Sequence, residues 1–532
     1  MKLWDVVIVG GGLAGLGLAK QLINQSPQLA IVVLEKNAFP RPPAIAKVGE
    51  STVEIGSHYL AERLQLKQHL QSQHLKKFGI RMFFGEDHSD FSQLDELGAS
   101  QTFAIPTYQI DRGVIENHLA AEIQAAGVTL IDQATIQSVD LTPSDKRVHY
   151  SNAERELIEL RSRWLIDAAG RAAFIKTQQT LAEPNAHSAH AVWFRVDKTI
   201  VIDEWSNDCD WKARCTPQDA RWLSTNHLTG AGYWLWIIPL ASGVTSIGIV
   251  MDDTAFEQSQ IQDERSARQW LARHQPRCAE AIADARFLDC VVLNNYSYSC
   301  KQVFSSGGWA ITGEAGVFAD PFYSPGSDFI AIANDFICEL VCEETNGQDI
   351  RLKCLIYEKL FQSIYQNTLS LYTDQYGGFG DRVMMGTKLL WDYAYYWGVL
   401  SLLYFRGALK NTDTIRNLSP LLQEAQALNQ RMQTCFRQRA NMRLVLPPKG
   451  GFMDQYQIPC LHHFNKRLAS DEPSEIELDL KENIGMMQWV AKAIENMLSP
   501  LPSDSISAEE FSVLGNYRNS LNLNRDDYQK QK

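Results

Sequence analysis

The sequence lacks the features of several protein classes. It carries no excess of positive charge, because 50 Lys and Arg residues stand against 62 Asp and Glu residues, a net charge of −12. Binding to nucleic acid is therefore not expected. It also has no internal repeats and no long low-complexity linker. With 45% hydrophobic residues, it can form large cores, which excludes a chain disordered throughout.

The cysteine pattern gives no sign of a metal site. The ten cysteines are scattered and none forms a CxxC pair. Cys338 and Cys342 can share a helix face, but no second pair or histidine cluster completes a zinc site. We expect no bound metal and interpret the cysteines as reduced core thiols. No secretory signal is visible at the N-terminus, which favours a cytoplasmic location.

Long hydrophobic runs are also missing, with one stretch close to the limit. Residues 389–405 read LLWDYAYYWGVLSLLYF, which is shorter than the ~20 residues that span a bilayer. Asp392 and Ser401 interrupt it. We expect a buried or pocket-lining helix here, with peripheral membrane contact as the alternative.

The order of apolar runs and turns predicts an α/β protein. A β-rich run at 4–9, a glycine turn, a helix and a buried run at 31–35 form the opening of a parallel βαβ unit. We predict an α/β domain over 1–335 with an inserted β-sheet at about 188–300. Residues 336–532 are predicted as a helical region on the substrate side, and the polar tail after about 503 is expected to be poorly ordered.

The glycine turn has the spacing GxGxxG. Gly10 permits a tight turn, Gly12 lets a pyrophosphate approach the backbone, and Gly15 lets the helix pack on the strand. Glu35 ends the next strand, where a carboxylate binds the ribose of an adenosine, so NAD and FAD both fit. The residues predicted to contact this part of the cofactor are Gly10, Gly12, Leu13, Ala14, Gly15, Glu35 and Lys36.

Two later segments distinguish FAD from NAD. Residues 164–170 read WLIDAAG, and residues 313–326 read GEAGVFADPFYSPG. Both resemble segments of FAD monooxygenases of the p-hydroxybenzoate hydroxylase type, and Tyr108–Arg112 resembles their segment with an arginine near the flavin. The resemblance implies a Rossmann-type (GR2-like) FAD-binding domain, with Glu314 in place of the usual aspartate. The FAD contacts that it implies are Arg112, Asp167, Gly313, Glu314, Asp320, Pro321, Gly326 and Ser327.

Within that superfamily, three motifs resemble the flavin-dependent halogenases. Residues 234–239 read WLWIIP and match the family's WxWxIP, residues 47–52 read KVGEST, and residues 77–81 read KFGIR. The resemblance implies that Trp234 and Trp236 keep organic substrate away from the flavin. It implies a strap between flavin and substrate, and an essential lysine at Lys77. The strap residues predicted to contact the cofactor are Val48, Gly49, Glu50 and Ser51.

The residues themselves leave other interpretations open. Two tryptophans on one face of a strand can simply be core. The strap can be an ordinary loop that starts a helix, and Lys77 can be a solvated lysine beside Lys76. In the role that the resemblance implies, the Lys77 ammonium orients hypohalous acid or carries the halogen as a chloramine.

The chain departs from the tryptophan halogenases at residues 323–326, which read YSPG where that family has Glu-Ser-Thr-Gly. Tyr323 replaces the glutamate that assists the arene step and is our second candidate catalytic residue. Halogenases of phenols and pyrroles also lack this glutamate. Pro325 replaces a threonine whose N–H helps to hold halide, and proline has no N–H. The remaining donors are Gly326 and Ser327.

These motifs together predict a flavin-dependent halogenase. It would use FADH₂, O₂ and a halide to modify an electron-rich aromatic of the phenol, pyrrole or indole type, free or carrier-bound. Because the sequence has no second dinucleotide motif, we expect a separate flavin reductase as partner. An FAD-dependent monooxygenase or dehydrogenase of secondary metabolism is the first alternative, and a non-catalytic FAD-binding protein is the second.

Overall fold

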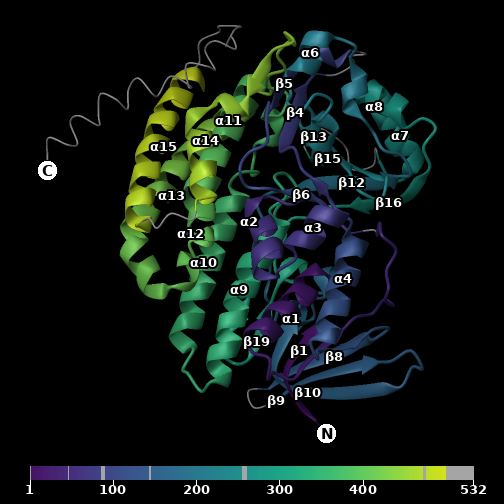
Figure 1. The fold of residues 1–532 in the computed structure, drawn as a ribbon, viewed down its shortest axis with the longest axis vertical. Coiled ribbons are helices and arrows are strands. Elements are labelled where there is room, and N and C mark those ends of the chain that lie inside the picture. Colours follow the sequence, from purple (N-terminus) through teal and green to yellow (C-terminus); the bar gives the residue numbers. More distant parts are fainter. Residues whose placement is uncertain are drawn as a thin grey trace, which may run out of the picture.

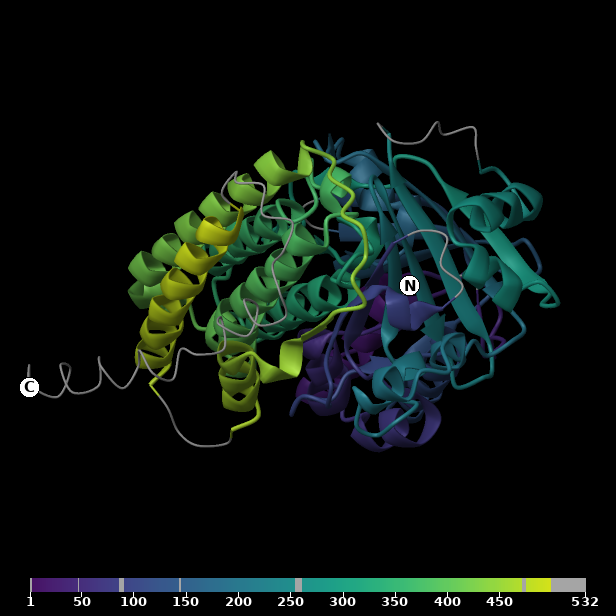
Figure 2. The same ribbon diagram turned by 90° about the horizontal axis from the view of Figure 1, so that it is seen from above.

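The protein consists of two eight-stranded sheets beside a layer of long helices (Figures 1 and 2). The computed structural model describes residues 2–45, 47–85, 90–142, 145–253, 261–470 and 475–498. The tail after residue 503, which we expected to be poorly ordered, lies outside the described residues.

The first sheet carries the nucleotide-binding topology. Its order is β18-β19-β10-β1-β2-β7, and β1 pairs in parallel with both β10 and β2. β2 and the C-terminal parts of β1 and β10 are continuous buried apolar runs, as expected for strands covered on both faces. The strands of this sheet are β1 (Leu3–Val9), β2 (Ile31–Leu34), β7 (Thr129–Ile131), β8 (Thr135–Thr142), β9 (Asp145–Ser151), β10 (Leu157–Asp167), β18 (Phe304–Ser305) and β19 (Trp309–Ile311).

The second sheet lies above the first in the view of Figure 1, with the order β16-β12-β15-β14-β13-β4-β5-β20. Its strands are β4 (Ile80–Phe84), β5 (Asp95–Gly98), β12 (Ala189–Val196), β13 (Thr225–Gly230), β14 (Tyr233–Pro239), β15 (Thr245–Asp252), β16 (Phe287–Leu293) and β20 (Phe452–Asp454). Two short pairs complete the strands: β3 (Leu75–Lys76) with β6 (Tyr108–Gln109), and β11 (Ala182–Pro184) with β17 (Tyr298–Cys300).

Helices pack on the first sheet and form the second half of the molecule. The helices of residues 1–325 are α1 (Leu13–Gln25), α2 (Glu54–His58), α3 (Lys67–Gln73), α4 (Arg112–Ala125), α5 (Phe174–Gln178), α6 (Cys209–Ala213), α7 (Glu264–His274) and α8 (Pro276–Ala281). Those that follow are α9 (Gly326–Thr345), α10 (Arg351–Leu369), α11 (Arg382–Tyr395), α12 (Leu402–Phe405), α13 (Thr412–Ala440), α14 (Pro459–Leu468) and α15 (Ile476–Leu498). A π-helical turn, Tyr396–Ser401, joins α11 to α12.

The predicted α/β fold is confirmed, and the second sheet draws strands from a wider part of the chain than 188–300. β4 and β5 come from before this range, and β20 comes from the C-terminal region. The 389–405 stretch is confirmed as helical and pocket-lining, since Asp392, Tyr393 and Leu403 line a cavity. Among the described residues, no helix combines the length and hydrophobicity needed to cross a membrane.

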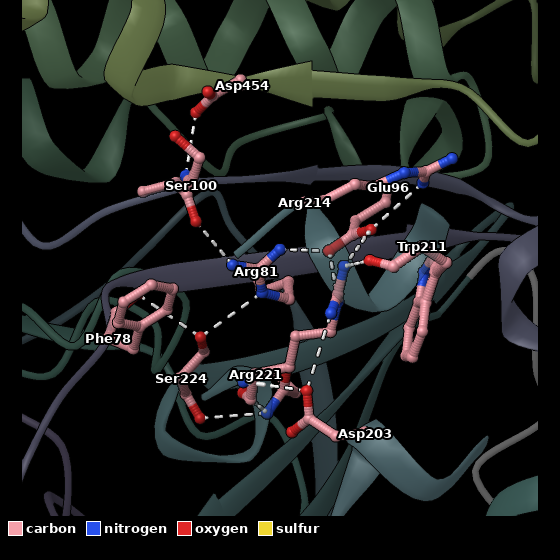
Figure 3. A network of polar contacts seen from close by, with 12 residues as sticks. Phe78, Arg81, Glu96, Ser100, Asp203, Trp211, Arg214, Arg221, Ser224 and Asp454 are labelled. Carbon is pink, nitrogen blue, oxygen red and sulfur yellow. Dashed lines mark hydrogen bonds and ion pairs between the residues drawn. The ribbon is translucent and has the colours of Figure 1, made fainter. Parts of the chain in front are cut away.

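A buried ion network holds β4, β5 and the C-terminal β20 together (Figure 3). The Glu96 carboxylate on β5 contacts Arg81 on β4, Arg221 at 2.9 Å and Arg214 at 3.3 Å. The backbone N–H of Glu96 donates to the carbonyl of Gly451 beside β20 at 2.8 Å. Burial raises the pKa of Glu96, but the guanidinium groups oppose this and leave it below its usual range. The Arg81 of the KFGIR motif is thus a structural residue that anchors the strand following Lys77.

Removal of this central charge is expected to be costly. Glu96→Gln leaves the fully buried Arg81 guanidinium without its counterion and leaves Arg221 with the more distant Asp203, at 3.6 Å. The free energy of unfolding should fall by about 3–5 kcal/mol, measured by urea denaturation. The control is Glu264→Gln, which removes an exposed i,i+4 pair with Arg268 and should change stability by about 0.5 kcal/mol or less. Equal effects of the two substitutions would contradict the structural role of Glu96.

Candidate active site

The glycine turn lies between β1 and α1 as predicted. Gly10 has φ +107°, and a Cβ there would lie 2.3 Å from the carbonyl oxygen of Ala168. A Cβ at Gly15 would lie 2.0 Å from the carbonyl oxygen of Gly10. At Gly12 the nearest atom to an added Cβ is Lys47 Nζ at 3.5 Å. Gly10 and Gly15 are therefore required by the fold itself, whereas Gly12 keeps a space open at the start of α1.

The side chains around this space fit the diphosphate of FAD. The buried Glu116 carboxylate accepts from Lys47 at 2.9 Å and from Arg112 at 2.7 Å, and it also contacts Arg41. Glu35 forms an ion pair with Arg41 at 2.9 Å and accepts from the N–H of Gly11. Three cations thus face two carboxylates at the N-terminus of α1, where the N-cap residue is Gly12 and Glu116 accepts from the N–H of Leu13 at 3.2 Å. This positive excess is the donor set that binds a pyrophosphate.

Two further observations support the fit. The Nε atoms of Arg41 and Arg112 are buried without a hydrogen-bond partner. Burial, together with Arg112 and Arg41, lowers the pKa of Lys47 to about 7. An anion beside these groups would satisfy them. Of the other predicted contacts, Leu13 and Ala14 begin α1, and Lys36 is exposed next to Glu35.

The space at Gly12 gives a test that separates cofactor binding from folding. Gly12→Val should fold normally, because only Lys47 Nζ and Glu116 lie within 4 Å of the new Cβ. It should lose bound FAD, because the side chain occupies the path of the pyrophosphate. Flavin absorbance of the purified protein and its thermal unfolding curve measure the two effects. Gly15→Val is the contrast and should fail to fold; normal FAD content in Gly12→Val would contradict this assignment.

The strap is a short extended segment that crosses to the second sheet. The N–H of Ile110 donates to the Glu50 carbonyl at 2.7 Å, and Ser51 forms a bridge with Gln109. Arg112 donates to the carbonyl of Val48 and so ties the strap to the cation group at α1. Gly49 has φ +93°, a conformation that favours glycine. Burial raises the pKa of Glu50 to about 7.

Lys77 lies directly behind the strap. Its side chain is buried, and its Nζ donates to Ser51 Oγ at 2.9 Å and to the Thr52 carbonyl at 3.2 Å. Burial lowers the pKa of Lys77 to about 8, against the opposing effect of Glu54 and Asp328. The alternative of a solvated lysine is therefore wrong: this amine is held in a dry position.

Two buried carboxyl groups accompany Lys77, and the sequence analysis named neither. Asp328 on α9 accepts from the N–H of Gly56 at 2.8 Å and from the Tyr396 hydroxyl at 2.6 Å. Burial raises its pKa to about 7 and also raises that of Glu54. Glu54 Oε2 has no hydrogen-bond partner. A carboxyl group with a pKa near 7 can take up or release a proton at neutral pH.

Tyr323 lines the same cavity as Asp328, but its hydroxyl bonds to a different carboxyl group. Its hydroxyl donates to Asp392 at 2.9 Å, and Asp392 is also paired with the buried Lys388 at 2.8 Å. Tyr323 and Ser324 both have positive φ angles, 68° and 57°, so the loop is tightly bent before Pro325. Burial and Asp392 raise the pKa of the Tyr323 phenol well above its ordinary value. Tyr323 thus remains a neutral hydrogen-bond donor at neutral pH.

The turns predicted to hold the flavin are rigid. Asp167 ends β10, and its carboxylate accepts from the N–H groups of Ala169 and Ile175 at 3.0 and 2.8 Å. Gly313 has φ +62°, and a Cβ there would lie 3.1 Å from Ala14 at the start of α1. Glu314 is half-exposed and lies 3.6 Å from Arg171. The segments 164–170 and 313–316 therefore meet the start of α1 at the carboxyl ends of the parallel strands β1, β10 and β19.

The loop before α9 is fixed from its other side. The buried carboxylate of Asp320 accepts from the hydroxyls of Tyr296 and Tyr376 and is 2.7 Å from His187. Pro321 follows it, and Pro325 stands at the N-cap of α9. The side-chain oxygen of Ser327 is buried without a hydrogen-bond partner. Asp320 thus shapes the loop that presents Gly326 and Ser327.

The two tryptophans lie on one face of β14, as predicted. Their ring centroids are 5.6 Å apart, and Trp234 also packs edge-on against Phe322 at 5.0 Å. Trp236 lies over Gly248 of β15, where an added Cβ would lie 2.1 Å from the indole. Trp234 is 1% and Trp236 5% exposed. Both are core residues. Through Phe322, Trp234 also packs against the 320–327 loop.

A cavity of about 290 Å³ opens next to this group of residues. Asp328, Tyr323 and Pro325 line one end of it, and Val53 and Ile80 bring it beside the strap and the start of β4. Its remaining wall comes from α10, the α11–α12 segment and α13. Asp328 therefore faces the cavity and also lies within electrostatic reach of Lys77.

Comparison with known proteins identifies the family. The family model described as tryptophan halogenase matches residues 86–368, more than half of the chain, and a lycopene cyclase model matches residues 5–49. The chain belongs to the tryptophan halogenase family. The predicted FAD-dependent halogenase acting on an aromatic substrate is thereby confirmed at the level of the family, and so is FAD as its cofactor.

Individual relatives of this halogenase are distant. It is 25% identical over 434 residues to the flavin-dependent halogenase chlA of Dictyostelium discoideum, covering 75% of this chain and 70% of the relative. It is 25% identical to a 1H-pyrrole-2-carbonyl-[peptidyl-carrier protein] chlorinase of Pseudomonas fluorescens, covering 61% and 72%. The crystal structure of halogenase PltM with phloroglucinol and FAD superposes with TM-score 0.70 at 17% identity, covering 94% and 98%.

The motifs predicted from the sequence come together in the halogenase, and their individual roles stay predictions. Arg41, Glu116, Glu54 and Asp328 were missed. Glu116 carried a signal, because it follows Arg112 by four residues on one helix. Asp328 gave none, since its neighbours Gly56 and Tyr396 are distant in the sequence.

Proposed function

We propose that this halogenase acts on a phenolic ring bound at the Tyr323–Asp328 end of the cavity. The observation that carries the proposal is that one short segment holds both groups: Lys77, a buried amine, donates to the Thr52 carbonyl, and Asp328, a carboxyl group that lines the cavity, accepts from the Gly56 N–H. Tyrosine hydroxyls and the Asp392 carboxylate at this end suit a polar hydroxylated ring. A phenol is also electron-rich, so it does not need the glutamate that Tyr323 replaces.

The protein's own residues have separate tasks in this mechanism. Arg41, Lys47 and Arg112 would hold reduced FAD at the glycine turn, where it would activate O₂ for the two-electron oxidation of halide to hypohalous acid, with the second oxygen atom leaving as water. Lys77 holds that acid by a hydrogen bond from its ammonium and polarises the halogen toward the ring. The ring carbon bonds to the halogen as the halogen–oxygen bond breaks, and the Lys77 ammonium gives a proton to the departing hydroxyl, which leaves as water. The ring carbon then loses its proton to the Asp328 carboxylate, and this proton returns to Lys77. Trp234 and Trp236 keep the ring on the far side of the strap.

The preference for a phenol is tested by incubating the enzyme with a flavin reductase, NADH, FAD and bromide or chloride. The substrates offered are a panel of phenols, pyrroles and indoles. We expect halogen isotope patterns in the products of phenols above all, measured by mass spectrometry. A separate reductase is part of the proposal, and so is the cytoplasmic location, where NADH is available. Preferential turnover of pyrroles or indoles would contradict the phenol assignment.

The halide site is proposed at the start of α9. Pro325 contributes no N–H, so the donors are the backbone groups of Gly326 and Ser327 and the partnerless Ser327 hydroxyl. With one donor fewer, bromide should be favoured over chloride, because it loses its hydration shell more easily.

Pro325→Thr restores the missing N–H and should raise chloride use. Each hydrogen bond to a charged group is worth about 1.5–3 kcal/mol, so we expect a gain of about tenfold or more in apparent chloride affinity. The measurement is the ratio of chlorinated to brominated product in mixed halide. Pro325→Ala restores the N–H without the threonine hydroxyl and should behave in the same way. An unchanged ratio in both variants would place the halide elsewhere.

A further inference from the structure

The cavity is much longer than one aromatic ring. Its lining includes Leu360 to Thr368 on α10 and Asp392 to Leu403 on the α11–α12 segment. At 1.5 Å per residue, these stretches extend roughly 12 Å and 16 Å along their helices. The helices that contribute lie side by side in the helical half of the molecule (Figures 1 and 2). The cavity is therefore a channel that runs along the helices.

The two ends of this channel differ in chemistry. Tyr323, Asp328, Asp392 and Asn429 lie at the end beside Pro325, where Tyr323 bonds to Asp392 and Trp391 bonds to Asn429. The opposite end is aliphatic, and the residues that line it are Ile332, Leu360, Leu403, Leu409 and Ile415. Contacts along the α11–α12 segment give this order: Asp392 accepts from Tyr323, Tyr396 donates to Asp328, and Tyr404 lies with Ile332 and Leu409.

One side wall of the channel is exposed to solvent. Between α10 and α13 the lining becomes polar and more exposed, with Ser363 and Gln423 exposed and Ser419 and Gln426 half-buried. A ring placed at the tyrosine end would leave the aliphatic end to be filled by another part of the same molecule. An aliphatic channel of this kind is filled favourably by hydrocarbon and unfavourably by water.

We propose that the substrate is a phenol carrying an unbranched hydrocarbon tail, with the ring at the Tyr323–Asp328 end and the tail against Leu403, Leu409 and Ile415. This inference rests on the proposed function and specifies its substrate. The tail supplies binding energy remote from the reacting carbon and fixes the ring in place.

A binding series tests the tail without requiring halogenation. The FAD-loaded protein is titrated calorimetrically with 4-alkylphenols bearing methyl, propyl, hexyl and nonyl tails. Each buried methylene contributes about 0.8 kcal/mol, so the dissociation constant should fall about threefold to fourfold per added carbon until the channel is full. A flat series, or binding of none of these phenols, would overturn the proposal.

Two substitutions locate the tail. Leu403→Trp shortens the channel at its aliphatic end and should weaken hexylphenol binding at least tenfold while leaving methylphenol unchanged. Leu403 and Ile332 are both buried, so a large new side chain can disturb folding at either position. Ile332→Phe adds less volume than Leu403→Trp and serves as a second, smaller obstruction at the same end. Lys359→Ala, on the exposed face of α10 and outside the channel lining, is the control and should change neither ligand. Loss of methylphenol binding in step with hexylphenol, or no loss of either, would place the tail elsewhere.

Failure of this proposal is distinguishable from failure of the proposed function. If short phenols are halogenated and the dissociation constant does not change with chain length, the halogenase mechanism is supported and the proposal of a hydrocarbon tail is wrong. If long-tailed phenols bind as described and no phenol is halogenated, the channel stands and the reaction is wrong. If the enzyme modifies only a ring attached to a carrier protein, the proposal of a hydrocarbon tail is wrong, because the linker to the carrier would then occupy the channel.

Discussion

Lys77→Met is expected to abolish halogenated product while flavin oxidation continues. Methionine keeps most of the volume of the buried side chain but removes the ammonium that binds Ser51 and the Thr52 carbonyl. Loss of one positioned charged donor costs about 10²–10³-fold in kcat. The measurement is halogenated product by mass spectrometry together with NADH consumption in the coupled reductase assay. NADH consumption should be near that of the unsubstituted enzyme, because the predicted FAD contacts are at α1 and the strap backbone.

The neighbouring lysine provides the control for this substitution. Lys76 is exposed on β3, so Lys76→Met should retain full activity. Loss of FAD from the Lys77 variant would indicate that Lys77 holds the strap and has no role in chemistry. Full halogenation by Lys77→Met would exclude the mechanism described above.

Asp328→Asn is expected to lower kcat by about 10²-fold and to change the pH profile. As a base Asp328 must be deprotonated, so activity should rise as pH increases through about 7, the value to which burial raises its pKa. As a donor Lys77 must be protonated, so activity should fall as pH increases through about 8, the value to which burial lowers its pKa. The profile should therefore have a narrow maximum between these values.

The acid side of this pH profile distinguishes a role of Asp328 as a base from a purely structural role. In Asp328→Asn the rise through pH 7 should disappear, while the fall near pH 8 remains. Tyr396→Phe is the matched control, because it removes one hydrogen bond to Asp328 and keeps the carboxyl group. It should shift the rise to higher pH without abolishing it, since the lost hydrogen bond had stabilised the charged form. A profile of the asparagine variant that keeps its acid limb would exclude Asp328 as the base.

Local patterns predicted the elements that bind the nucleotide, because each is encoded by adjacent residues. The strand at 4–9, the glycine turn and Glu35 follow one another in the chain, and the structure places them as expected. The helix start at Gly326 was also predictable, since it follows a Pro-rich loop. The WLWIIP motif predicted one face of a strand correctly for the same reason.

The channel and the carboxyl pair could not be predicted in this way. Asp328 meets Gly56 and Tyr396 through the packing of α9 on α2 and on the π-helical turn, and no local pattern encodes that contact. The channel lining comes from six separate stretches of chain. The edge strand β20 joins the second sheet from residue 452 onward because Glu96 and its neighbours offer backbone partners there. Such contacts depend on tertiary packing.

The central claim is that Lys77 and Asp328 direct a halogen onto a phenol, and halide dependence tests it most directly. The enzyme is supplied with reductase, NADH, FAD and one phenol, in bromide buffer and in halide-free buffer, and every product is identified by mass spectrometry. The account predicts a monobrominated phenol in bromide and no modified phenol without halide. Formation of a hydroxylated or dehydrogenated product at the same rate in both buffers would contradict it and would make the enzyme a monooxygenase or dehydrogenase.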